Sequence, residues 1–270
     1  MAVTQKDKAA RFCALHEGPH AFVIPNPWDV GSARLLAGLG FQALATSSGA
    51  SAGARGRSDG ELSREEALAH ARVIVGATEL PVSADLEKGF GDAPEAVAET
   101  VRLAAETGLV GCSIEDSTHD PERPQYEFEH AVARIEAAVA AARTLDFPFT
   151  LTARAENFVC GNPDLDDAIR RLQAYERVGA DVLFAIGLPD LDAVRAVCAA
   201  VTKPVNFMAG IPGRSFTVAA LEAAGVRRIS LGTSLYNSAM TGLVAAAREV
   251  AEAGTFGYTE RSSDAARKLR

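Results

Sequence analysis

Residues 82–115 read VSADLEKGFGDAPEAVAETVRLAAETGLVGCSIE, and this stretch decides the fold. It begins with a short strand candidate at 82–87, continues with an Ala-rich amphipathic helix candidate at 93–107, and ends with a second strand candidate at 110–115. The strand candidates are apolar on both faces rather than alternating, as expected of parallel strands covered by helices. The stretch therefore predicts a strand-helix-strand unit of a parallel sheet.

The same alternation runs along most of the chain. Strand candidates lie at 21–26, 42–47, 82–87, 110–115, 149–154, 181–186, 204–209 and 227–232. Helix candidates lie at 30–39, 63–77, 93–107, 128–144, 164–178, 190–200, 215–224 and 235–253. Eight such units predict a (β/α)8 TIM barrel, which typically needs about 250 residues. The alternative is a doubly wound open sheet, but the segment after the first strand candidate, Pro25-Asn26-Pro27-Trp28-Asp29, lacks the glycine fingerprint of that fold.

Composition limits the class of protein. At about 150 residues per domain, 270 residues allow one or two domains. No linker-like stretch interrupts the alternation, so we predict a single barrel domain over 1–270, with 235–270 as a C-terminal helical extension. The net charge of -8 argues against a nucleic-acid partner, and no apolar run approaches the length of a membrane span. The N-terminus lacks a signal-peptide core and the four cysteines lack metal-type spacing, which predicts a cytoplasmic protein with reduced thiols.

Acidic side chains gather at the ends of neighbouring strand candidates. Asp85 and Glu87 are two residues apart and face the same side of a strand, and Glu115 ends the next strand candidate. Because the carboxyl ends of barrel strands form one rim, these carboxylates are expected to converge there. Like charges at short range need a countercharge, and oxygen ligands without nearby His or Cys suit Mg2+ or Mn2+.

Two further features suggest a small acid beside that metal. Arg154 ends the neighbouring strand candidate and is placed to bind a substrate carboxylate in a forked arrangement. The turn at Ser48, Gly49 and Ala50 offers backbone N–H groups to an oxyanion. Taken singly, each carboxylate could instead be a helix cap or an ion-pair partner. A rival barrel would bind phosphate through the glycine-bearing loops 209–213 and 232–234, which leaves the acidic rim unexplained.

At these residues the sequence resembles the isocitrate lyase/phosphoenolpyruvate mutase superfamily. The matching features, in chain order, are Asp29-Val30-Gly31-Ser32-Ala33, Ser48-Gly49 with Asp59 beyond, Asp85-x-Glu87-x-Gly89-Phe90-Gly91, Ile114-Glu115-Asp116 and Arg154. The family's Asp-x-Asp-x-Gly-Tyr-Gly appears here with Glu87 and Phe90 substituted.

The resemblance implies a Mg2+-dependent barrel that makes or breaks C–C or P–C bonds next to a 2-oxo acid through an enolate-like intermediate. It places Asp85, Glu87 and Glu115 around the metal, directly or through water. The substrate-binding residues would be Ser48, Gly49, Ala50, Asp59, Arg154 and Asn206. It also implies a homo-oligomer, a tetramer or a dimer, in which the 235–270 region docks on a neighbouring subunit.

The loop after the fourth strand candidate departs from the family. The lyases carry Lys-Lys/Arg-Cys-Gly/Ser-His there, whereas this chain reads Ser117-Thr118-His119-Asp120-Pro121-Glu122-Arg123-Pro124, with neither Lys nor Cys. The phosphonate-forming members also use a lysine in this loop. Where the lyases place an asparagine four residues beyond a proline, this chain has Met208, and Asn206 lies two residues earlier on the same strand face. His119 is then the nearest replacement acid.

We therefore expect a carbon–carbon lyase that acts on a small 2-hydroxy or 2-oxo di- or tricarboxylic acid, with Arg154, His119 and Glu115 as catalytic residues. Two alternatives remain open at this stage. One is a phosphonomutase-type enzyme that interconverts phosphoenolpyruvate and phosphonopyruvate. The other is a 2-oxo-acid-binding homologue without turnover.

Overall fold

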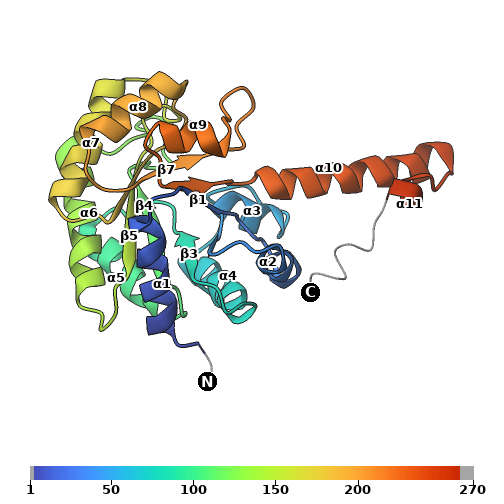
Figure 1. Cartoon of the computed structure of the whole chain (residues 1–270), viewed down its shortest axis with the longest axis horizontal. Coiled ribbons are helices and arrows are strands. Elements are labelled where there is room, and N and C mark those ends of the chain that lie inside the picture. Colours follow the sequence, from blue (N-terminus) through green and yellow to red (C-terminus); the bar gives the residue numbers. More distant parts are fainter. Residues whose placement is uncertain (1–2, 262–270) are drawn as a thin grey trace.

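A computed structural model describes residues 3–261, which form a parallel barrel surrounded by helices (Figure 1). Neighbouring strands pair in parallel in the order β1-β8-β7-β6-β5-β4-β3-β2. The strands are β1 (Phe22–Ile24), β2 (Leu44–Ala45), β3 (Val82–Asp85), β4 (Gly111–Glu115), β5 (Thr150–Ala155), β6 (Val182–Ala185), β7 (Val205–Met208) and β8 (Arg228–Ser230). The amide of Ala45 donates to the Pro25 carbonyl at 3.1 Å, which joins the two ends of this order. The predicted TIM barrel is confirmed, and the open-sheet alternative is wrong.

The helices cover the outside of the barrel, as the alternation predicts. They are α1 (Gln5–Glu17), α2 (Val30–Gly38), α3 (Ser48–Gly53), α4 (Arg64–Gly76), α5 (Pro94–Ala105), α6 (Phe128–Arg143), α7 (Leu165–Arg177), α8 (Leu191–Ala200), α9 (Val218–Ala223), α10 (Ser234–Arg248) and α11 (Tyr258–Arg261), with a π-helical turn at Glu249–Ala253. Local sequence sets their ends. Ser63 and Glu66 form a reciprocal capping box at the start of α4, and Gly108 follows α5 with a left-handed φ of 93°.

Several elements differ from the sequence prediction. Helix α1 was not predicted, because five charged residues dilute its apolar pattern. Its Phe12 is fully buried and packs with Phe22 and Ile24 of β1. The predicted turn at Ser48 is the start of α3, and the strand predicted at 42–47 forms ladder pairs only at Leu44–Ala45.

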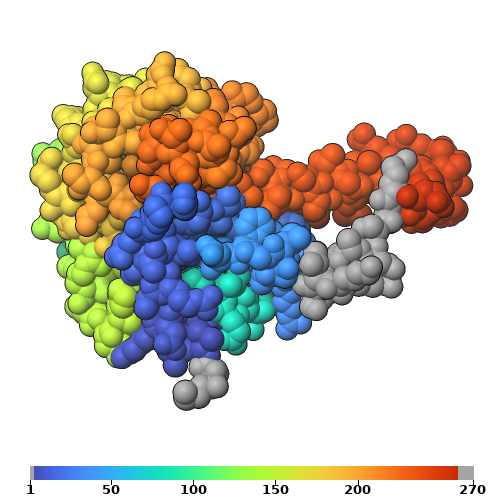
Figure 2. Space-filling model, in the orientation of Figure 1, coloured from blue at the N-terminus to red at the C-terminus, as the bar shows by residue number. Residues whose placement is uncertain are grey.

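Helix α10 extends away from the barrel (Figures 1 and 2). None of its residues is buried, and Leu243 and Val244 are 60% and 49% exposed. Beyond it, Phe256 is 60% exposed. The predicted extension 235–270 is described only as far as residue 261, so the assignment of 1–270 to one domain stays a prediction. No helix in the described part of the chain is long and apolar enough to cross a membrane.

Asp167, in the first turn of α7, ties this helix to the end of β5 and gives a pH-dependent contribution to stability. It accepts from Asn157 Nδ2 at 2.8 Å and Arg171 Nε at 2.9 Å. Burial opposes the charge, but these bonds and the one from Arg170 lower the pKa of Asp167 from 3.8 to about 2.

Because the folded-state pKa of Asp167 is depressed, its stabilisation is present above the unfolded value of 3.8 and is lost as pH falls towards about 2. We expect Asp167→Asn to lower the free energy of unfolding by about 1 kcal/mol at pH 7. The difference between wild type and variant should shrink between pH 4 and pH 2 in urea titrations. A difference that does not change with pH over this range would contradict this assignment.

Candidate active site

A cavity of 570 Å³ opens at the carboxyl ends of the strands, where barrel enzymes carry their active sites. The structure brings most of the predicted residues to its wall, namely Ser48, Asp59, Asp85, Glu87, Glu115, His119, Arg154 and Asn206. Gly49 and Ala50 are not among the lining residues. They lie just behind the wall, in the first turn of α3.

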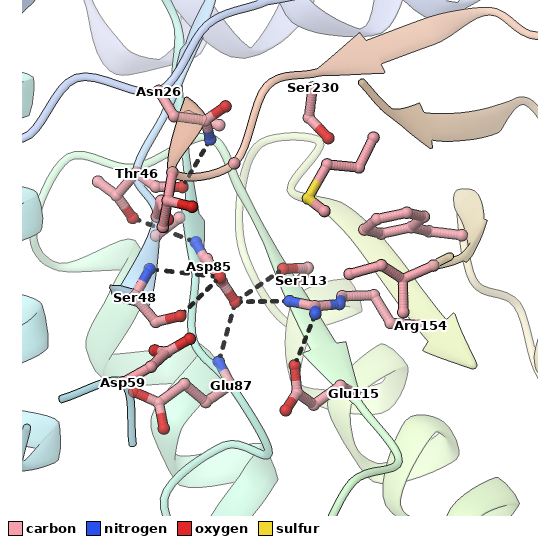
Figure 3. Close-up of a pocket in the computed structure, with 18 of the residues that line it drawn as sticks. Asn26, Thr46, Ser48, Asp59, Asp85, Glu87, Ser113, Glu115, Arg154 and Ser230 are labelled. Atoms are coloured by element: carbon pink, nitrogen blue, oxygen red, sulfur yellow. Dashed lines mark hydrogen bonds and ion pairs between the residues drawn. The ribbon is translucent and has the colours of Figure 1, made fainter. Parts of the chain in front are cut away.

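Arg154 is the centre of the charged network (Figure 3). Its Nη1 lies 2.8 Å from Asp85, its Nη2 lies 2.9 Å from Glu115, and its Nε lies 3.0 Å from Glu156. Burial opposes the charge, but Glu115, Glu156 and Asp85 raise the pKa of the guanidinium further above its usual value. Arg154 is therefore a buried counterion shared by three carboxylates. Its predicted contact with a substrate carboxylate stays a prediction.

Asp85 is held as an ionised carboxylate. Burial opposes the charge, but Arg154 and hydrogen bonds from Ser48 lower its pKa. Ser48 Oγ donates to Asp85 at 2.9 Å, and the Glu87 amide donates to it at 3.2 Å. The carboxylate therefore has a fixed orientation at the end of β3.

Nearby cations compensate the charge of two neighbouring carboxyl groups, Glu87 and Asp59, less fully than that of Asp85. Burial and the charge of Asp85 raise the pKa of Glu87 to about 7, and the same two causes raise the pKa of Asp59. The backbone of Glu87 is left-handed, with φ at 50°, a conformation that is uncommon outside glycine. The site therefore holds more negative charge than Arg154 neutralises.

This donor set fits a hard divalent cation held largely through water. The labelled carboxylates Asp59, Asp85, Glu87 and Glu115 face the same space in Figure 3. Within residues 3–261, no three His, Cys, Asp or Glu side chains are grouped closely enough to hold an ion directly. Mg2+ usually keeps several waters and needs only one or two protein carboxylates, so the two observations are compatible.

His119 lies at the mouth of the cavity, on the loop between β4 and α6. Its Nε2 is 2.9 Å from Glu115 Oε1, and its Nδ1 is 3.6 Å from Glu87 Oε2. The hydrogen bond to Glu115 raises the pKa of the imidazole, and the charges of Glu115 and Glu87 add to the effect. An isolated antiparallel β-bridge between Ser117 and Gln125 holds the two ends of this loop together. The sequence-predicted acid is therefore beside two predicted metal-site carboxylates.

The predicted oxyanion turn has its amides partly occupied by protein groups. The Ser48 amide donates to Asp85 at 3.3 Å, and the Ala50 amide donates to Ser47 Oγ at 3.3 Å. Gly49 has a packing role, because a Cβ there would lie 2.9 Å from Thr233 Cγ2 and 3.1 Å from Asp59 Oδ2. The glycine thus lets Asp59 and the start of α10 approach α3.

We expect Gly49→Ala to displace Asp59 and to lower the free energy of unfolding by about 1–3 kcal/mol through overpacking. Thermal unfolding and the KM for the substrate measure the two effects, and KM should rise. Gly76→Ala is the matched control, because nothing lies within 4 Å of the added Cβ and alanine favours the helix. If the two variants behave alike, the packing argument is wrong.

Sequence reasoning predicted Asn206 but missed Arg228, with which it forms the polar floor of the cavity. Asn206 Oδ1 accepts from Arg228 Nε at 2.8 Å, and Arg228 Nη2 donates to Thr152 Oγ1 at 2.9 Å. Burial and the charge of Arg154 lower the pKa of Arg228 to about 9. A charged residue inside a strand candidate was the available signal for Arg228, and its spacing of two from Ser230 places both on the inner face.

Asp116 anchors the rear of the site, a role that its sequence position did not reveal. It is 2% exposed and accepts from Tyr175 Oη at 2.7 Å, Arg171 Nη1 at 3.1 Å and the Glu156 amide at 2.8 Å. These bonds join the ends of β4 and β5 to α7. Asp116 therefore fixes the backbone at the ends of β4 and β5, which carries the side chains of Glu115 and Glu156.

The cysteines offer no nucleophile. The four cysteines are free, and Cys112 is fully buried within β4. Burial raises the pKa of Cys160, the one nearest the rim, to about 11, so the thiolate is not favoured at neutral pH.

Comparison with known proteins decides the family. The family model described as phosphoenolpyruvate phosphomutase matches residues 12–251. The chain belongs to the phosphoenolpyruvate mutase/isocitrate lyase superfamily.

Individual relatives agree with this assignment. A solved structure from Burkholderia cenocepacia J2315, assigned as a lyase/mutase, is 50% identical with a TM-score of 0.95, and the match covers 98% of this chain and 95% of that one. The 2-methylisocitrate lyase of Escherichia coli K12 is 32% identical over 213 residues, which is 76% of this chain and 70% of the relative. The structure of a 2,3-dimethylmalate lyase is 25% identical with a TM-score of 0.86, covering 97% and 94% of the two chains.

These superfamily relatives confirm the family predicted from the strand-end motifs. They also confirm the prediction of an enzyme of the carbon–carbon lyase type.

Proposed function

We propose that this superfamily member is a Mg2+- or Mn2+-dependent lyase. It would cleave a carbon–carbon bond in a small 2-hydroxy or 2-oxo di- or tricarboxylic acid through an enolate intermediate. The observation that supports this most strongly is the convergence of Asp59, Asp85, Glu87 and Glu115 around one space, with Arg154 as their buried countercharge. An acidic site can bind an acidic substrate only if a cation neutralises part of its charge.

Asp85, Glu87 and Glu115 would hold the metal, mainly through water, and the metal would stabilise negative charge on the 2-oxygen of the substrate. Arg154 keeps Asp85 and Glu115 in place. The substrate carboxylate would lie against the start of α3, near Ser48.

Bond cleavage leaves an electron pair on the released carbon, which must then take up a proton. His119 is the donor we propose for this step. Its Nε2 lies 2.9 Å from Glu115 Oε1, which orients the imidazole at the cavity mouth. The hydrogen bond to Glu115 raises the pKa of the imidazole, which favours the protonated form that a donor needs.

Release of a 2-oxo acid tests the proposal. Purified protein is incubated with Mg2+ and 2-methylisocitrate, isocitrate, oxaloacetate or 2,3-dimethylmalate, and the product is captured by a coupled dehydrogenase. We expect turnover of at least one acid, dependence on Mg2+, and loss of activity in Glu115→Ala. Inactivity on all four acids, with wild type and Glu115→Ala indistinguishable, would reject the lyase.

Phosphonate chemistry is the second candidate, and the family model described as phosphoenolpyruvate phosphomutase favours it. A phosphoryl group would need cations near the β4–α6 loop. Arg123 is the arginine of that loop, and its side chain is 85% exposed and turned to Asp120 at 3.7 Å. Phosphorus NMR of an incubation with phosphonopyruvate decides between the two reactions. Binding of a 2-oxo acid without any turnover would instead indicate a non-catalytic homologue.

We also propose a homo-oligomer in which α10 packs on a neighbouring subunit. The projecting helix with exposed Leu243 and Val244, and with Phe256 beyond it, supports this arrangement.

Sedimentation velocity should give a mass above that of one chain, and Leu243→Asp should lower it, because a charge would be buried in the contact. Val73→Asp on α4 is the control, since Val73 is 50% exposed on the barrel itself. A wild-type monomer at micromolar concentration would contradict the proposal.

A further inference from the structure

The loop between β3 and α5, residues 86–93, carries Glu87 to the wall of the cavity along an unusual backbone path. Glu87 and Phe90 are left-handed, with φ of 50° and 59°, and Gly89 between them has a φ of 82°. Left-handed backbone costs a residue with a side chain on the order of 1–3 kcal/mol. Contacts from outside the loop must therefore hold it in this path.

Arg134 of α6 makes most of those contacts. Its Nη1 donates to the carbonyls of Gly91 at 2.7 Å and Asp92 at 2.5 Å, and its Nη2 donates to the carbonyl of Lys88. The side chain is 1% exposed, and its Cζ lies 4.1 Å from the ring centroid of Tyr126. The guanidinium thus spends its hydrogen bonds on the backbone of one loop.

Stability alone is a poor explanation for this buried guanidinium. Within residues 3–261, Arg134 forms no ion pair, and its Nε is buried without a partner. Burying such a charge is costly, and apolar side chains of similar volume often stabilise a protein as well or better. What an apolar side chain cannot do is bind several carbonyl groups in a fixed arrangement. The geometry of the loop is therefore the stronger explanation.

Thr100 of α5 completes the set of donors. It is fully buried, and its Oγ1 donates to the Gly89 carbonyl at 2.8 Å. The amide of Glu115 donates to the Glu87 carbonyl at 3.0 Å. With the bonds from Arg134, the carbonyls of residues 87, 88, 89, 91 and 92 each accept a hydrogen bond from outside the loop.

The same loop also supports the loop that carries His119. Lys88 Nζ donates to the Thr118 carbonyl at 2.8 Å and to Asp92 Oδ1 at 2.9 Å. Thr118 directly precedes His119 in the chain. A displacement of residues 88–92 would therefore move both Glu87 and the proposed proton donor.

We propose that Arg134 is a positioning residue for Glu87, assisted by Thr100. Together they fix the backbone of residues 87–92, so that the Glu87 carboxylate faces the same space as Asp85 and Glu115 (Figure 3). In the described part of the chain, the residues that line the cavity include neither Arg134 nor Thr100. The inference rests on the proposed function, in which Glu87 helps to hold the metal.

Binding of Mn2+ to metal-free protein, in the absence of substrate, tests this role. Electron paramagnetic resonance measures free Mn2+ directly, so the readout does not depend on turnover. Arg134→Met should raise the Kd for Mn2+ about tenfold, as is typical when a group that orients a metal ligand is lost. Arg134→Lys should recover little of this affinity, because an ammonium lacks the planar fork that reaches several carbonyls of the loop.

Arg143→Met is the matched control. Arg143 also lies on α6 and donates to backbone carbonyls, those of Phe149 at 3.4 Å and Gly179 at 2.9 Å, but it is not among the described residues that line the cavity. This variant should lose stability in urea titrations and keep the wild-type Kd for Mn2+. A purely structural role of Arg134 would give the same result as this control.

Thr100→Val tests the same role with a smaller change. The substitution keeps the shape of the side chain and removes the donor to the Gly89 carbonyl, so the Kd for Mn2+ should rise about threefold to tenfold. Thr107→Val is its control, because Thr107 Oγ1 donates to the Ala104 carbonyl of its own helix at 2.7 Å. That variant should bind Mn2+ as the wild type does.

The outcomes separate this inference from the proposed function. A folded Arg134→Met protein with the same Kd for Mn2+ as Arg143→Met overturns the inference while leaving the lyase proposal standing. If Arg134→Met does not fold, a wild-type Kd in Thr100→Val overturns it in the same way. A wild-type protein that binds no Mn2+ rejects the proposed metal dependence and the inference with it.

Discussion

Replacing Arg154 with methionine is expected to abolish turnover and to lower the free energy of unfolding by about 3–5 kcal/mol. The guanidinium pairs with Asp85, Glu115 and Glu156 within 3.0 Å, and its side chain is 10% exposed. Its removal leaves three carboxyl groups near one another, with only His119 beside Glu115 as a cationic partner in the described part of the chain. They would either take up protons or move apart, and either response destroys the arrangement that holds the metal.

Urea unfolding and 2-oxo acid release measure the two effects of Arg154→Met. Arg154→Lys should recover part of the stability but little of the activity, because an ammonium cannot fork onto three carboxylates. Arg195→Met is the control, since Arg195 is 55% exposed and pairs with Asp192 within one helix. An Arg154→Met protein as stable and active as this control would contradict the role of Arg154 as shared counterion.

Asp85→Asn should reduce turnover by about a thousandfold, which corresponds to about 4 kcal/mol of transition-state stabilisation. The amide keeps the shape of the side chain and can still accept from Ser48. It lacks the charge that attracts a divalent cation. Since Arg154 keeps Glu115 and Glu156 as partners, the effect on stability should be much smaller than that of Arg154→Met.

The Mg2+ concentration for half-maximal activity should rise in Asp85→Asn. Steady-state rates over a Mg2+ titration measure it, with Asp192→Asn as the control because Asp192 is 91% exposed. A variant that keeps the wild-type rate and Mg2+ dependence would show that Asp85 is not a metal ligand.

The parallel barrel and the acidic rim were accessible from the sequence for one physical reason. Parallel strands covered by helices read as short apolar runs, and the residues that end such runs must meet at one rim. Asp85, Glu115 and Arg154 were found in this way. Helix α1 was not predicted in this way, because its many charged residues make the periodicity of its few buried apolar positions hard to detect.

Pairwise contacts across the barrel were not predictable. The engagement of Arg154 by Asp85, two strands away, depends on the register of β3, β4 and β5 and on the inward direction of both side chains. The unpredicted position of Arg228 beneath the site depends on contacts with strands that lie far apart in the sequence. The spacing of residues within one strand indicates which side chains share a face. Only the closed barrel shows which side chains of different strands come into contact.

The most direct test of a metal-bound 2-oxo acid in this site is the binding of oxalate. The protein is first stripped of metal, and binding is then measured once with added Mg2+ and once with a chelator. Oxalate is a planar dianion with adjacent oxygens, so it resembles the enolate of a 2-oxo acid and chelates Mg2+ in the same way. The acidic rim predicts that calorimetry detects oxalate binding about a hundredfold tighter with Mg2+ than with chelator, and that Asp85→Asn abolishes this difference. Equal binding of oxalate with and without Mg2+ would contradict a metal-bound 2-oxo acid as the ligand of this site.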